Sequence, residues 1–154
     1  MTKFAVASDH RGVELKKAVV DFLKSKGHAV QDMGPADPAK SVDYPDYALK
    51  TAEAVRQGKA DQGIVICHSG IGVSVTANKV KGVRAALCQT AEQAELARKH
   101  TNANVLALPA GFVTPALVKE ILTKWLTTSF EGGRHEGRIG KIDAYENRKD
   151  SHGG

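Results

Sequence analysis

The sequence lacks the features that mark membrane, secreted and disordered proteins. No apolar run approaches the roughly 20 residues that a membrane span needs, so no membrane is expected as a partner. The opening residues MTKFAVASDH contain no signal-peptide hydrophobic region, and two cysteines in 154 residues do not make a disulfide framework. With 42% hydrophobic and 25% charged residues, the chain is predicted to be a cytoplasmic globular protein with a substantial core.

A concentrated basic region is also missing. The net charge of +5 is spread thinly along the chain, and aromatic residues make up only 5% of it. Proteins that bind nucleic acid usually gather lysine and arginine on one face or along one helix. We therefore expect no nucleic-acid partner.

What the sequence does contain is a regular alternation of strand and helix patterns. The expected strands cover residues 3–8, 29–33, 63–67, 83–88 and 105–108. The expected helices cover residues 11–26, 44–57 and 72–79, a stretch from Thr90 to near His100, and a stretch that starts at Pro115. Alternation of this kind predicts an α/β fold with a doubly wound, Rossmann-like sheet of five parallel strands and helices on both faces.

The last part of the chain has a different character. Residues 131–150 are predicted to form a polar helix with Ile139 and Ile142 as its few apolar contacts. Such a helix is weak alone, so we expect it to lie toward a partner subunit. The expected domain covers residues 1–148, and residues 149–154 are expected to form a flexible tail.

Three segments follow expected strands, at the sheet edge where parallel sheets bind ligands. They are Ser8-Asp9-His10, the stretch from Cys67 to Gly72, and residues 108–111. In the second segment a buried strand ends in cysteine, and SGIG then opens a helix whose N–H groups attract an anion and lower a thiol pKa. The alternative is a tight turn that needs glycine, with Cys67 as a small core residue. Spacing alone leaves both interpretations open.

Other candidates are ambiguous on spacing alone. Arg134 and Arg138 lie four residues apart, so they either hold a phosphate or form a solvated helix face. His10 and His100 each lie near the end of an element, where a single histidine is more often structural. Asp43 is either a cap within the loop, the default interpretation, or a substrate contact.

A metal site is not expected from the sequence. His28, His135 and His152 form no recognisable ligand cluster with the cysteines.

Taken together, these segments resemble the ribose-5-phosphate isomerase B family, which includes the galactose-6-phosphate isomerase subunits. The matching stretches run in family order from Phe4 to about Arg148: SDHRGVELK, VDYPDYA, GIVICHSGIGVSVTANKVKGVRAAL, LARKHTNANVLAL and EGGRHEGR. The resemblance implies isomerisation of a phosphorylated sugar through a cis-enediolate without metal or cofactor. The first candidate reaction is the conversion of ribose 5-phosphate to ribulose 5-phosphate.

The resemblance also implies roles for individual residues. Cys67 is the base, His100 opens the sugar ring, and Ser69 helps to stabilise the enediolate. The residues implied in binding the sugar or its phosphate are Asp9, His10, Arg11, Asp43, Tyr44, His68, Gly70, Ile71, Gly72, Val73, Thr101, Arg134 and Arg138. Family members imply a homodimer or a dimer of dimers with the active site at the subunit interface.

Three departures from the family pattern bear on the substrate. The family usually has Cys-Gly-Thr-Gly where this chain has Cys67-His68-Ser69-Gly70, and His-Asn where it has His100-Thr101. Gly111 stands where the family often has an arginine, a loss for which Arg11 is a candidate replacement. A four-carbon or six-carbon sugar phosphate therefore remains an alternative substrate. Two alternative functions also remain: a non-catalytic sugar-phosphate-binding protein, and a cysteine hydrolase that pairs Cys67 with His68 or His100.

Overall fold

A five-stranded parallel sheet forms the centre of the protein, as predicted. The computed structural model describes residues 1–150, and the part of the expected tail from residue 151 lies outside them. The strands are β1 (Lys3–Ser8), β2 (Ala29–Asp32), β3 (Gln62–Cys67), β4 (Ala85–Leu87) and β5 (Val105–Pro109). They lie in the order β2-β1-β3-β5-β4, and every neighbouring pair is parallel.

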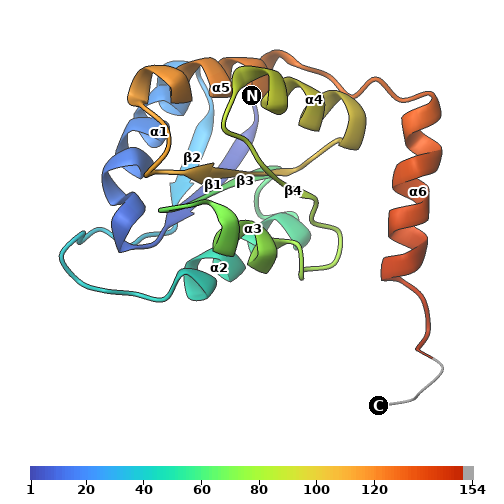
Figure 1. The fold of residues 1–154 in the computed structure, drawn as a ribbon, viewed down its shortest axis with the longest axis horizontal. Coiled ribbons are helices and arrows are strands. Elements are labelled where there is room, and N and C mark those ends of the chain that lie inside the picture. Colours follow the sequence, from blue (N-terminus) through green and yellow to red (C-terminus); the bar gives the residue numbers. More distant parts are fainter. Residues whose placement is uncertain (151–154) are drawn as a thin grey trace.

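Helices cover both faces of the sheet, which confirms the doubly wound fold class (Figure 1). They are α1 (Val13–Ser25), α2 (Tyr44–Arg56), α3 (Ile71–Ala77), α4 (Ala91–Thr101), α5 (Pro115–Thr127) and α6 (Arg134–Glu146). One core cluster joins α1, α4 and α5 to the sheet, and a second joins α2 and α3 to the opposite face. None of the helices within residues 1–150 is both long enough and apolar enough to cross a membrane.

Local sequence signals mark three of the helix ends. The Thr90 hydroxyl accepts a hydrogen bond from the Gln93 N–H at 3.1 Å and caps α4. Thr114 caps α5 in the same way, through the Leu117 N–H at 3.2 Å. Gly27, two residues after the end of α1, has the positive φ of 85° that a helix C-terminus favours. These three ends agree with the sequence prediction.

Several elements differ from their predicted bounds; the last helix, for example, covers Arg134–Glu146 instead of residues 131–150. A 3₁₀ turn over His10–Gly12 precedes α1, because the Asp9 carboxylate accepts hydrogen bonds from the N–H groups of Arg11 and Gly12. The strand expected over residues 83–88 is only three residues long. At its start the Arg84 N–H donates to the Asn104 side chain at 2.8 Å, which replaces a strand partner.

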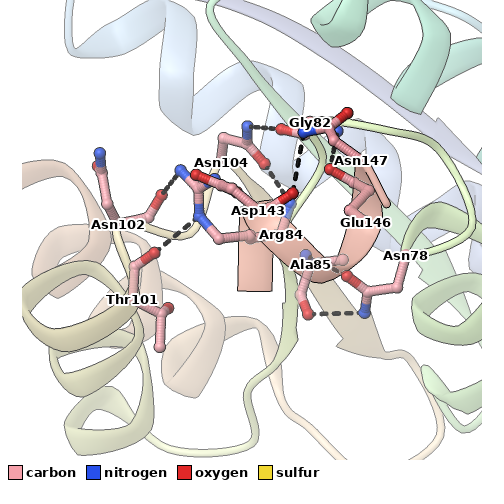
Figure 2. Close-up of polar contacts among 10 residues, drawn as sticks. All are labelled: Asn78, Gly82, Arg84, Ala85, Thr101, Asn102, Asn104, Asp143, Glu146 and Asn147. Atoms are coloured by element: carbon pink, nitrogen blue, oxygen red, sulfur yellow. Dashed lines mark hydrogen bonds and ion pairs between the residues drawn. The ribbon is translucent and has the colours of Figure 1, made fainter. Parts of the chain in front are cut away.

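Helix α6 stands away from the sheet, beside the end of α4 (Figure 1). Figure 2 shows the polar contacts in this region: Arg84 lies 3.8 Å from Asp143 of α6 and donates to the carbonyl oxygen of Thr101, at the end of α4, at 2.8 Å. The Gly82 N–H donates to Glu146 at 3.0 Å. Ile142, predicted as an apolar contact, is instead 54% exposed, because α6 has no sheet beneath it.

Candidate active site

Two of the predicted segments meet where the order of the sheet changes direction. β2 lies on one side of β1 and β3 on the other, and ligands of open α/β sheets bind beyond such a point. Here the Asp9 N–H donates to the Ile66 carbonyl at 3.0 Å, which ties the end of β1 to the end of β3. The third segment joins them, because the Ala110 N–H donates to the Cys67 carbonyl at 2.9 Å.

Cys67 ends β3 at this edge. It is a free thiol, 5% exposed, and it packs against Ala48 and Val73 from the two helices on that face. Burial raises the pKa of the second free cysteine, Cys88, to about 12 and keeps its thiol protonated at neutral pH. Cys88 follows β4, two strands away from β3 in the sheet, so only Cys67 lies at the point where the strand order changes direction.

The loop after Cys67 needs its glycines. Gly70 has φ of 73°, and a Cβ there would lie 2.5 Å from a methyl group of Leu87. A Cβ on Gly72 would lie 2.6 Å from the Tyr44 ring, so this ring is packed directly against the start of α3. The Ser69 hydroxyl accepts from the Ile71 N–H at 3.2 Å and keeps its own proton for another acceptor. The structure thus brings Tyr44 to the predicted loop.

The residues after β1 have structural partners as well. Asp9 is buried and caps the 3₁₀ turn through its carboxylate. The His10 Nδ1 atom accepts from the Val42 N–H at 3.2 Å, which anchors the end of the long loop before α2. Asp43 occupies the N-cap position of α2, but its exposed side chain makes no capping hydrogen bond, so the cap interpretation is wrong. Arg11 is exposed beside this segment.

A second cluster forms around His100, at the end of α4. The rings of His100 and His135 stack with centroids 4.3 Å apart and planes 13° apart. Both Nε2 atoms face one oxygen of Glu131, at 4.0 and 3.9 Å. Arg134 lies 3.9 Å from the other oxygen, and Arg138 is exposed one turn further along α6.

His135 is the buried member of this cluster. Its Nε2 atom is buried without a hydrogen-bond partner among the described residues. Burial, followed by the positive charges of His100 and Arg134, lowers the pKa of His135 and favours the neutral ring.

The ligand atoms of His100, Glu131 and His135 lie within 4.8 Å of one another, the one such group in residues 1–150. These three residues have no metal-ligand spacing in the sequence, so the group was not predictable from it. Nearly parallel rings direct their lone pairs side by side rather than toward a common point, and the neighbouring arginine charges repel a cation. This geometry does not favour a metal ion.

The fold separates the two clusters within one chain. Helix α4 runs from the ligand-binding edge back to the start of β5, so its last residues lie at the opposite edge of the sheet. Its 11 residues span about 16 Å. His100 and the arginines of α6 therefore do not share a site with Cys67 of the same chain.

The residues that depart from the family pattern have defined positions. The His68 ring packs against Gly111 and Phe112, away from the cluster that contains Cys67, which argues against a Cys67–His68 dyad. The Thr101 hydroxyl donates to the Ala97 carbonyl at 2.6 Å, so its proton is already committed.

Comparison with known proteins agrees with the resemblance in the motifs. Residues 4–142 match the model of the Ribose/Galactose Isomerase family. Ribose-5-phosphate isomerase B of Clostridium thermocellum is 48% identical, with a TM-score of 0.91 over 94% of this chain and 97% of that one. The Mycoplasma genitalium enzyme with bound ribulose-5-phosphate is 46% identical, with a TM-score of 0.92 over 96% and 97%. The D-erythrulose-4-phosphate isomerase of Pectobacterium atrosepticum is 40% identical, over 97% of this chain and 98% of its own.

Proposed function

Because this chain belongs to the ribose/galactose isomerase family and is a sugar-phosphate isomerase, we propose that it interconverts an aldose phosphate and its ketose with Cys67 as the base. One observation carries the proposal: Cys67 is a free thiol at the point where the sheet order changes direction, beside the Ser69–Gly72 loop. Ligands of open parallel sheets bind at this point.

In the proposed reaction the Cys67 thiolate takes the proton from the carbon beside the carbonyl. The electron pair of that C–H bond forms the double bond of a cis-enediolate, and negative charge develops on the former carbonyl oxygen. The Ser69 hydroxyl and the N–H groups of Gly70, Ile71, Gly72 and Val73 stabilise this charge. The thiol then returns its proton to the former carbonyl carbon. The hydroxyl proton of the adjacent carbon moves to the former carbonyl oxygen, so the carbonyl group now lies on that adjacent carbon and the thiolate is regenerated.

His100 opens the furanose ring by proton transfer in this scheme. It is partly exposed, so a sugar can reach it, and Glu131 faces its Nε2 atom. Arg134 and Arg138 hold the phosphate through charge-assisted hydrogen bonds, because both are exposed on α6 beside this cluster.

A complete site then requires two subunits, because Cys67 and His100 lie at opposite edges of one sheet. We propose a homodimer, alone or as half of a dimer of dimers, in which the Cys67 cluster of one chain meets the His100 cluster of its partner. A groove of about 350 Å³ runs along the free edge of β4 and is lined by Leu87, Leu96 and His100 among others. An unpaired strand edge beside apolar groups is a suitable surface for a second copy.

The proposed substrate is ribose 5-phosphate, converted to ribulose 5-phosphate. The 40% identity to a D-erythrulose-4-phosphate isomerase favours a four-carbon sugar phosphate as the second candidate. Turnover of four-, five- and six-carbon aldose phosphates by metal-stripped protein tests the choice through kcat/KM. The highest value is expected for ribose 5-phosphate, and Cys67→Ala is expected to abolish turnover while the fold survives. Tight binding without turnover of any sugar would contradict the catalytic proposal.

A further inference from the structure

The His68 imidazole occupies the space that a side chain at position 111 would fill. An ideal Cβ on Gly111 would lie 2.5 Å from Nδ1 and 2.8 Å from Nε2 of His68. The two backbones are also joined, since the Gly111 N–H donates to the His68 carbonyl at 2.9 Å. The ring can therefore take this position only because residue 111 is glycine.

The Phe112 ring also packs beside the His68 imidazole. Its ring centroid lies 5.7 Å from that of His68, with the planes tilted by 57°. His68 is exposed, and its ring nitrogens form no hydrogen bond within residues 1–150. An imidazole that packing holds in place, with both nitrogens available, therefore lies at the edge of the sheet that contains Cys67.

We propose that His68, whose ring packs against Gly111, is a specificity-determining residue that hydrogen-bonds an oxygen of the phosphorylated sugar. The proposal rests on the proposed function, because it assumes that the sugar binds at the edge marked by Cys67. The oxygen belongs either to the phosphate or to a sugar hydroxyl, and an imidazole N–H serves both. Loss of one such bond weakens substrate recognition by about tenfold.

Gly111→Ala displaces the imidazole without altering His68. The new methyl group meets the far end of an exposed side chain, so the ring moves and the fold is retained. We expect KM for the preferred sugar phosphate to rise about tenfold, with kcat less affected. His68→Gly is expected to have the same effect. In the double variant Gly111→Ala adds nothing further to His68→Gly, because no ring is left to displace.

His68→Phe separates hydrogen bonding from packing. Phenylalanine keeps a ring over Gly111 but has no nitrogen, so its KM is expected to match that of His68→Gly. Gly140→Ala is the matched control, because its Cβ would enter open space on α6. Comparing sugar phosphates with the corresponding unphosphorylated sugars distinguishes the two oxygens: a phosphate contact affects only the phosphorylated form.

Two results would overturn the proposal. One is a wild-type KM in Gly111→Ala or His68→Phe. The other is a rise in KM when Gly111→Ala is added to His68→Gly, since the methyl group would then block the sugar itself. If the wild type turns over none of the sugars, the proposed function fails separately. The Kd for ribose 5-phosphate is then measured by calorimetry for the same set of variants. Unchanged affinity in all of them would contradict the role of His68.

Discussion

Cys67 and His100 lie at opposite edges of the sheet, and this leads to a testable prediction about how two subunits form the active site. If each site combines Cys67 of one chain with His100 of its partner, two inactive variants will restore activity when they share a dimer. Cys67→Ala removes the base. His100→Asn removes the proposed ring-opening group, and loss of acid–base catalysis costs about 100-fold or more.

The size of the expected recovery of activity follows from the geometry of the fold. Helix α4 alone separates the two edges by about 16 Å, which exceeds the reach of any side chain. A dimer with one chain of each variant has one site with both groups intact and one site that lacks both. We therefore expect about half of the wild-type activity per dimer.

Co-expression of the two variants with different affinity tags, followed by tandem purification, yields the mixed dimer for assay. Each variant alone, purified in the same way, gives the baseline. Mixed dimers no more active than this baseline would refute the shared site and would require Cys67 and His100 to act within one chain or independently.

Three further predictions concern stability and reactivity. Arg84→Ala removes the hydrogen bonds that the guanidinium donates to the carbonyl oxygens of Thr101 and Asn102 at the end of α4. It should lower the free energy of unfolding in urea by about 2 kcal/mol, against less than about 0.5 kcal/mol for the exposed control Arg56→Ala. Iodoacetamide at pH 8 should label Cys67 before Cys88, whose pKa burial raises to about 12; peptide mass spectrometry showing Cys88 labelled first would contradict this. Burial lowers the pKa of His135, so below about pH 6.5 the unfolded chain binds a proton that the folded chain does not. Tm should therefore fall as the pH drops below about 6.5, and His135→Phe should make this fall smaller.

Signals read over a few residues predicted much of this fold. Thr90 and Thr114 cap their helices through the N–H groups three residues on, and the run Gly63–Cys67 is a central buried strand. These features depend on local hydrogen bonding and on burial of both sheet faces, which leave a pattern in the sequence. The loop from Cys67 to Gly72 was predictable for the same reason.

Contacts between distant segments were not predictable in this way. His100, Glu131 and His135 meet because α6 turns back beside the end of α4, and no short spacing encodes that turn. The pattern of α6 shows that it is polar but not that it leaves Ile142 exposed. Likewise, the sequence places His68 next to Cys67, and only the structure shows its ring on Gly111.

The most direct test of the central claim is proton NMR of metal-stripped protein with ribose 5-phosphate in D2O. We expect ribulose 5-phosphate with solvent deuterium at the carbon bonded to the carbonyl. With Cys67→Ala we expect neither conversion nor exchange. Conversion without deuterium would indicate direct hydride transfer instead of an enediolate. Wild-type rates in Cys67→Ala would contradict the role of the thiol.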